Sequence, residues 1–231
     1  MPVPIIIFHH GLFTLGDPPE ILTPAISIAY EQMIVFKDSG LLDAASELHV
    51  GINGSREDSE VYVKSIMPDN AQVVYHGAGC RTELRTILMI EKRVKSLKEE
   101  AHILYVHQKG STHPPDDPLR TDWRECFMLH LVFNWRVCVF DLQNGCEAVG
   151  CHWMTPPQTP PTQYIFAGNM WWARASFLAT LPSVMERSRI KESGIDSLES
   201  RYEAEVYLCN GPRLPVVKDY CPGWWVGKPH M

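Results

Sequence analysis

Three short segments of the sequence combine histidine with glycine, and each follows an apolar run. They are residues 9–11 (His-His-Gly), 76–79 (His-Gly-Ala-Gly) and 107–110 (His-Gln-Lys-Gly). Glycine lets the backbone approach oxygen atoms closely, and Lys109 supplies a point charge that suits a phosphate group. One histidine at the end of a strand is more often an exposed polar residue than part of a site. Because three such ends occur in one chain, we expect a site for an anionic ligand.

The apolar runs that precede these segments have the length and composition of strands. We predict strands at residues 3–8, 47–52, 71–75 and 102–107, with helices at 23–39, through Tyr62 and Ile66, and at 82–99. Such alternation is typical of a parallel sheet covered by helices. Ligands of these sheets bind outside the carboxyl ends of the strands, where the histidine and glycine segments would lie. The predicted fold class is therefore α/β, with a Rossmann-like, mostly parallel sheet flanked by helices.

The second half of the chain carries less regular signals. We predict a buried helix at 123–142, strands at 147–150 and 164–168, and helices at 171–181 and 200–209. Two proline-rich segments, 113–118 and 155–162, interrupt these elements, and the first is a candidate lid. Neither segment needs to separate two domains, so we expect residues 1–231 to form a single domain.

Composition argues against several classes of protein. The 27 acidic and 21 basic residues give a net charge of −6, which does not favour a nucleic-acid partner. The longest apolar stretch, 127–140, contains polar residues and is shorter than the roughly 20 apolar residues of a spanning helix, so no transmembrane segment is expected. The amino terminus lacks the features of a secretory signal. We expect a cytoplasmic protein and leave open a peripheral contact with a membrane.

The seven cysteines contain no C-x-x-C pair and lie in apolar contexts, so we interpret them as reduced and structural. Cys146, Cys151 and His152 are conceivable zinc ligands. Their spacing fits no standard zinc pattern, and no fourth ligand is evident from the sequence. A zinc site at these residues is therefore a weaker interpretation than reduced, structural cysteines.

Several motifs resemble those of a family of GT-A-type glycosyltransferases with H-T-K-G and G-N-F-W-W-A-R motifs. The matching segments are 105–110 (Tyr-Val-His-Gln-Lys-Gly), Trp123-Arg124 and 168–174 (Gly-Asn-Met-Trp-Trp-Ala-Arg). Gly79-Cys80 with Glu83, and residues 201–205 (Arg-Tyr-Glu-Ala-Glu), extend the match, so that it covers residues 3–208. The resemblance implies a GT-A-like fold that holds a nucleotide-diphosphate sugar at the carboxyl edge of its sheet.

The resemblance divides the chain into a nucleotide-binding half, 1–112, and an acceptor- and sugar-binding half, 113–231. It implies a nucleotide-sugar donor and a saccharide or glycan acceptor. Together with the strand ends and the first proline-rich segment, it gives the following candidate residues. Donor-binding candidates are His9, His10, Gly79, Glu83, His107, Lys109 and Gly110; sugar- or acceptor-binding candidates are Trp123, Arg124, Asn169, Trp171, Trp172 and Arg201; candidate catalytic bases are Glu203, Glu205 and Asp117. We expect at least one tryptophan of the Trp-Trp pair to pack in the core. Glu203 and Glu205 are two residues apart on a predicted helix, so at most one of them faces the cleft.

One hallmark of GT-A enzymes is missing. They usually hold Mn²⁺ or Mg²⁺ with an Asp-x-Asp at the end of the fourth strand, and this chain has no Asp-x-Asp. His107, Gln108 and Lys109 stand in its place, where Lys109 could supply part of the metal's charge and His107 could ligate a metal. Metal dependence and inversion or retention at the sugar are left open.

Two other hypotheses about the function are alternatives to a transferase. A non-catalytic nucleotide- or carbohydrate-binding protein of the same fold would explain the missing Asp-x-Asp. A histidine-based metallohydrolase using His9, His10, His76 and His107 is weaker, because no carboxylate lies at ligand spacing with them.

Overall fold

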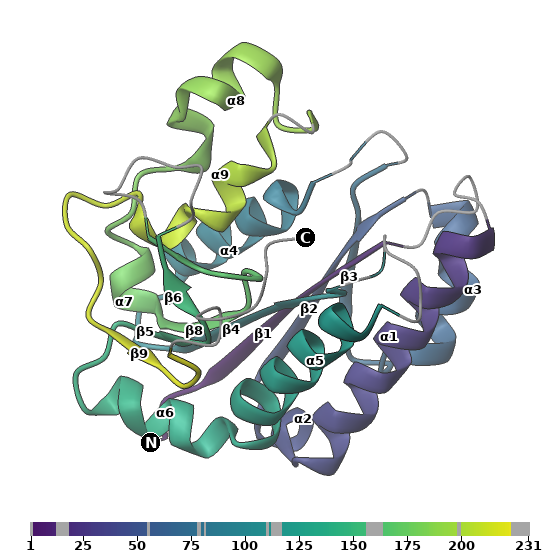
Figure 1. Ribbon diagram of the computed structural model, residues 1–231, viewed down its shortest axis with the longest axis horizontal. Helices are drawn as coiled ribbons and strands as arrows, with labels where there is room; N and C mark the ends of the chain where they lie inside the picture. Colours follow the sequence, from purple (N-terminus) through teal and green to yellow (C-terminus); the bar gives the residue numbers. More distant parts are fainter. Residues whose placement is uncertain are drawn as a thin grey trace.

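The computed structural model describes residues 2–12, 19–54, 56–77, 80, 82–109, 111, 117–155, 164–197 and 200–222. Their centre is a seven-stranded sheet (Figure 1). In order across the sheet, its strands are β3 (Gln72–Tyr75), β2 (Glu47–Asn53), β1 (Ile5–Leu12), β4 (His102–His107), β8 (Trp171–Arg174), β5 (Ala148–Gly150) and β9 (Val217–Asp219). The first four are mutually parallel, whereas β8 runs antiparallel to both β4 and β5. The predicted fold class, a Rossmann-like and mostly parallel sheet flanked by helices, is confirmed.

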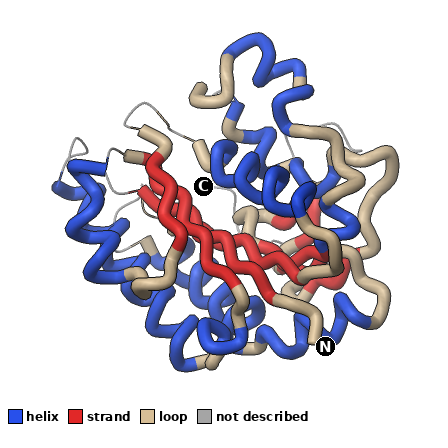
Figure 2. The backbone as a smooth tube through the Cα atoms, turned by 180° about the vertical axis from the view of Figure 1, so that it is seen from behind, coloured by secondary structure: helices blue, strands red, loops and turns tan. Residues whose placement is uncertain are grey.

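Helices cover both faces of the sheet, which Figure 2 shows as a twisted layer between them. One face carries α1 (Pro19–Asp38), α2 (Leu41–Ala44), α3 (Arg56–Ile66), α5 (Pro118–Phe127), the π-helix η1 (Met128–Phe133) and α6 (Trp135–Gln143). The other carries α4 (Leu84–Ser96), α7 (Ala175–Leu178), η2 (Val184–Glu186), α8 (Ser188–Ser193), α9 (Tyr202–Glu205) and η4 (Tyr207–Cys209). A two-stranded sheet, β6 (Trp153–Met154) with β7 (Ile165–Phe166), completes the described elements.

The alternation of side chains along β1 explains why two cores form. Ile5 and Ile7 point into the core beneath α1 and α5, whereas Ile6 and Phe8 point into the core beneath α4. A strand buried on both faces reads as a continuous apolar run, which is what the start of the chain provides. No helix in the described ranges has both the length and the apolarity needed to cross a membrane.

Four predicted elements differ from the structure. Strand β1 continues to Leu12, so its histidines lie inside the sheet and not beyond its end. The helix expected at 123–142 begins at Pro118 and passes through a π-helical turn. Residues 171–174 are a strand and not the start of a helix, because they pair with β4 and β5. The helix expected at 200–209 is two short helical turns.

An ion pair joins the start of β2 to α4 on the far side from the strand ends. Arg93 donates to Glu47 through two of its guanidinium nitrogens, Nε and Nη2, at 2.8 and 2.5 Å, and His49 adds a contact of 2.7 Å. The hydrogen bonds from Arg93 lower the pKa of Glu47 from 4.5 to about 2.

Because the folded-state pKa of Glu47 is depressed, the pair stabilises the fold above pH 4.5 and loses its effect as the pH falls toward 2. We expect Glu47→Gln to lower the free energy of unfolding by a constant amount above about pH 5. The difference from the wild type should shrink between pH 4.5 and 2, as measured by urea denaturation. Glu99→Gln, at an exposed position after α4, is the control. A difference that stays constant down to pH 2 would contradict this role.

Candidate active site

His107 ends β4 and marks the carboxyl edge of the sheet. Its Nε2 lies 2.6 Å from the carbonyl oxygen of Gly168, which accepts a hydrogen bond from it. Burial is the main cause that lowers the pKa of His107, so the imidazole is neutral at pH 7. The contact with Gly168 fixes the tautomer and the orientation of the ring, and it leaves Nε2 without a lone pair for a metal.

Lys109 follows two residues later and is half-buried. Its Nζ lies 4.8 Å from the centroid of the Trp123 ring, a cation–π distance. Burial lowers the pKa of the Lys109 ammonium, and the carboxylates of Glu205 and Glu83 partly offset this shift. A cation held in poorly hydrated surroundings interacts strongly with an anion that reaches it, so Lys109 suits a phosphate group.

Glu83 stands at the beginning of α4, as its N-cap residue, but its side chain does not cap the helix. Instead the carboxylate accepts a hydrogen bond from the hydroxyl of Tyr105 in β4. The Tyr105 ring packs between His107 and Trp171, with centroids 6.2 and 5.3 Å away. Tyr105 therefore fixes Glu83 over the strand end. It belongs to the Tyr-x-His-x-Lys-Gly segment, but its contact with Glu83 is not visible in the sequence.

Glu205 comes from α9 and approaches Lys109 from the second half of the chain. Burial raises the pKa of its carboxyl group, and Lys109 acts in the opposite direction. Glu203, two residues earlier, turns away and binds Arg187 at 2.7 Å. Hence only Glu205 faces the strand-end cluster, consistent with the expectation that at most one of the two would do so. Arg201 is exposed beside them, with its guanidinium 4.9 Å from the centroid of the Tyr202 ring.

The turn between β7 and β8 is the partner of His107. Gly168 and Asn169 have φ angles of 94° and 49°, in the left-handed region that favours glycine. A Cβ at Gly168 would lie 2.6 Å from the Phe127 ring, so only glycine fits there. Asn169 is buried, and its Oδ1 accepts a hydrogen bond of 3.0 Å from Trp171 Nε1. Its Nδ2 has no hydrogen-bond partner among the described residues.

The two tryptophans of the Trp-Trp pair are not placed to stack on a sugar. Both are 0% exposed, and they pack on opposite faces of the sheet. Trp172 Nε1 also donates to the carbonyl of Leu131 at 2.8 Å. The strand alternation of β8 sends one ring into each core. Because both rings are buried, neither Trp171 nor Trp172 is available to stack on a sugar in this structure, contrary to the expectation from the sequence.

Three candidates on α5 have local partners. Asp117 caps the helix, and its Oδ1 accepts hydrogen bonds from the backbone nitrogens of Leu119 and Arg120, at 3.1 and 3.3 Å. Trp123 is 5% exposed and packs under Lys109. Arg124 reaches the carbonyl of Lys109 at 3.4 Å and Glu31 at 3.3 Å.

His9 and His10 support the strand ends from inside the sheet. His9 Nε2 lies 2.9 Å from the side-chain oxygen of Gln32, whose amide donates in turn to the carbonyl of His107. His10 Nδ1 contacts Thr86 at 2.8 Å. Burial lowers the pKa of His9 to about 4 and that of His10 well below its ordinary value, so both are neutral. These contacts are those of structural histidines, and they give no support to the metallohydrolase reading.

The strand-end residues do not fit Mn²⁺ or Mg²⁺. Such cations need several oxygen ligands, yet Glu83 is engaged by Tyr105, and among the described residues the Lys109 charge interacts electrostatically with the carboxylates of Glu83 and Glu205. In the part of the chain that the structure describes, one group of three side chains has its metal-binding atoms within 4.8 Å of one another, and it lies elsewhere.

Some predicted site residues and loops lie outside the described residues. They are Gly79, Gly110 and most of the two proline-rich segments. Two surface hollows, of about 350 and 390 Å³, are lined by residues around the starts of β2 and β3, away from His107. Neither hollow includes Glu83, Lys109 or Glu205, the three residues that define the candidate site.

Residues 17–215 match the family described as "Domain of unknown function (DUF8361)". The chain belongs to this family. The DUF8361 match runs from before α1 to beyond η4, so it takes in every residue of the strand-end cluster. No curated protein matches the sequence.

Solved structures similar to this DUF8361 chain have low sequence identity to it. A candidate nucleotide-diphospho-sugar transferase from Desulfovibrio desulfuricans G20 has a TM-score of 0.46 and 11% identity, over 94% of this chain and 80% of that chain. CMP:2-keto-3-deoxy-manno-octonic acid synthetase complexed with CTP has a TM-score of 0.39 and 9% identity, over 87% of each chain. Glucosyl-3-phosphoglycerate synthase from Mycobacterium tuberculosis, in complex with phosphoglyceric acid, has a TM-score of 0.39 and 14% identity, over 84% of this chain and 68% of that chain.

Proposed function

We propose that this chain is a glycosyltransferase that moves a sugar from a nucleotide-diphosphate donor to a saccharide or glycan acceptor. The observation that carries the proposal is the cluster at the end of β4, where the half-buried Lys109 lies near the carboxylates of Glu83 and Glu205. Open α/β sheets bind their ligands at this edge. The motif resemblance of residues 105–110 and 168–174 supports the same reading.

In this proposal Lys109 binds the diphosphate. Negative charge develops on the leaving phosphate oxygen as its bond to the sugar breaks, and a fixed cation stabilises that charge. Lys109 is restrained by the Trp123 ring and by its backbone hydrogen bond to the His107 carbonyl, at 2.9 Å. Little reorganisation is then needed during the reaction. Exposed Arg201 is a candidate second contact to the same charge.

Glu205 would act as the general base. The acceptor hydroxyl gives its proton to the Glu205 carboxylate, its oxygen forms the new bond to the anomeric carbon, and the bond from that carbon to the diphosphate breaks. Burial raises the pKa of Glu205, which makes its carboxylate a stronger base than an ordinary one. Glu83, Tyr105 and His107 are positioning residues, and Trp123, Arg124 and Asn169 remain candidates for contacts to sugar or acceptor.

Donor binding and turnover test the function together. The full chain is screened by thermal shift against UDP-, GDP-, ADP-, CMP- and dTDP-linked sugars, with and without Mn²⁺, because a ligand of the native state raises the melting temperature. We expect a shift for one nucleotide that does not require Mn²⁺. Release of the nucleotide from the donor that binds then separates a transferase from a non-catalytic binding protein. No shift with any donor would overturn the proposal.

Lys109→Met tests the role of the cation. A charge-assisted hydrogen bond to phosphate contributes about 1.5–3 kcal/mol, so donor affinity should fall by about 10- to 150-fold. Isothermal titration of the donor measures the change. Lys95→Met is the matched control, because Lys95 is exposed at the end of α4, at the opposite end of the helix from Glu83. Equal affinities for the two variants would contradict the role of Lys109.

A further inference from the structure

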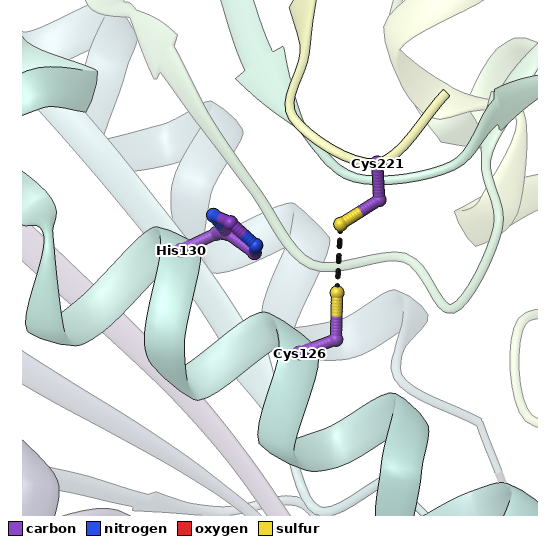
Figure 3. Close-up of side chains that lie close together, drawn as sticks. All are labelled: Cys126, His130 and Cys221. Atoms are coloured by element: carbon purple, nitrogen blue, oxygen red, sulfur yellow. Dashed lines mark hydrogen bonds between the residues drawn. The ribbon is translucent and has the colours of Figure 1, made fainter. Parts of the chain in front are cut away.

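A second cluster of reactive side chains lies on the α5 face, where three separate segments meet. Cys126 is on α5, His130 is four residues later on η1, and Cys221 follows β9. The sulfur atoms of Cys126 and Cys221 are 2.9 Å apart, and the ligand atoms of all three residues lie within 4.8 Å of one another. Figure 3 shows the two sulfur atoms facing each other, with the imidazole beside them. The spacing of four residues places Cys126 and His130 on one helix face.

A third thiol joins this cluster from the end of β5. Cys151 is fully buried, and its thiol interacts with those of Cys126 and Cys221. Thiolates are the form of cysteine that binds metals.

The backbone around the cluster is held by one carboxylate. Asp219 accepts hydrogen bonds from the backbone nitrogens of His152, Trp153 and Cys221, at 2.8, 3.0 and 3.0 Å. It therefore ties the segment after β5 to the segment after β9. His152 has a φ of 61°, a conformation that is costly for a residue other than glycine and is found where the surroundings impose it.

The supporting contacts also orient the imidazole. The His130 ring stacks on Tyr220, with centroids 5.8 Å apart, and the Tyr220 hydroxyl donates to Asp141 at 2.7 Å. His152 lies among Trp123 and Phe127, with ring centroids 6.2 and 5.7 Å away. Supporting contacts of this kind hold ligands in place around protein metal sites.

We propose that Cys126, Cys151, Cys221 and His130 bind one Zn²⁺ ion. Three sulfur ligands with one imidazole form a standard tetrahedral zinc set, and soft thiolates favour Zn²⁺ over Mg²⁺ or Mn²⁺. A disulfide between Cys126 and Cys221 would use two of the four groups and leave the third thiol and the imidazole unexplained. The set differs from the Cys146, Cys151 and His152 group weighed from the sequence, since its members are widely spaced along the chain.

The site would be structural, because four protein ligands leave no open position for a substrate. It would fasten the end of the sheet at β9 to α5, the helix that carries Trp123 and Arg124 to the Lys109 loop. Zinc binding is independent of the proposed transferase function.

The test uses the full chain, produced in zinc-supplemented medium and purified without chelator. Elemental analysis is expected to give about one zinc per chain, and replacement by Co²⁺ should give the strong thiolate-to-metal absorption of a sulfur-rich site. Cys126→Ser and Cys221→Ser should lose at least 90% of the metal, or about tenfold. Cys209→Ser, a half-buried cysteine on the opposite face of the sheet, is the matched control and should keep it.

A measurement on the wild type alone keeps the proposal testable if the variants do not fold. Zinc should protect three of the seven cysteines from alkylation, and a chelator should expose them and lower the melting temperature by at least about 5 °C. Mass spectrometry identifies the protected residues. Protein that contains no zinc and takes up no Co²⁺, or that carries a Cys126–Cys221 disulfide, would overturn the proposal.

Discussion

Replacement of Glu205 by glutamine is expected to lower the turnover number by about 10²- to 10⁴-fold, the usual contribution of a general base. Glutamine keeps the size of the side chain but cannot accept the proton of the acceptor hydroxyl. Donor affinity should change little, because the proposed contact with the diphosphate is made by Lys109. Release of the nucleotide in the presence of acceptor measures the rate, and titration of the donor measures binding.

Glu203→Gln is the matched control for this experiment. It makes the same substitution two residues away on α9, where the carboxylate binds Arg187 at 2.7 Å and Arg189 at 3.8 Å. Because Glu203 is 5% exposed and turned away from Lys109, its replacement should lower the free energy of unfolding but not the rate of the folded enzyme. Equal losses of turnover in the two variants would contradict the assignment of Glu205.

The pH dependence gives a second readout of the same residue. Burial raises the pKa of Glu205, so the acidic limb of the rate profile should lie above pH 4.5, the ordinary value. The rate falls as the pH drops through that pKa, because the protonated carboxyl group cannot act as a base. In the glutamine variant this limb should be absent from the small remaining rate.

The sequence was sufficient to predict the sheet edge at which the candidate site lies. It did not show that His9 and His10 lie inside the sheet. Alternation of apolar runs and helical stripes was sufficient to place β1, β2, β3 and β4, because each of these strands is short and bounded by turn residues. Strand β8 was missed, since Trp171 and Trp172 suit a helix as well as a strand. Pairing with β4 and β5 decides between them, and pairing between distant segments is not visible in one sequence.

The candidate site was only partly visible for a similar reason. His107 and Lys109 lie at and just beyond the end of a clear strand and belong to a motif, so they could be found. Glu83 could be found because it belongs to the Gly79-Cys80 segment that begins the preceding helix. The choice between Glu203 and Glu205 depends on which of them Arg187 binds. The metal-binding group depends on contacts between α5, the end of β5 and the segment after β9, which are separated by up to 95 residues.

Alanine at either position of the Trp-Trp pair should cost about 3–5 kcal/mol of unfolding free energy, because each change leaves a large cavity in a core. Trp171→Ala opens the core beneath α4 and removes the donor to Asn169, whereas Trp172→Ala opens the core beneath α5 and frees the Leu131 carbonyl. Total stabilities of domains are about 5–15 kcal/mol, so these losses would be a large share.

Phenylalanine variants separate packing from sugar recognition. Trp171→Phe and Trp172→Phe keep most of the ring volume but lose one hydrogen bond each, so the expected loss is smaller than for alanine, as measured by urea denaturation. If both tryptophans serve the cores alone, the folded phenylalanine variants should keep the KM of the acceptor, since neither ring is exposed. A rise in that KM with little loss of stability would show that a ring reaches the sugar after all, which would require β8 to move, because its pairing with β4 and β5 now holds one ring in each core.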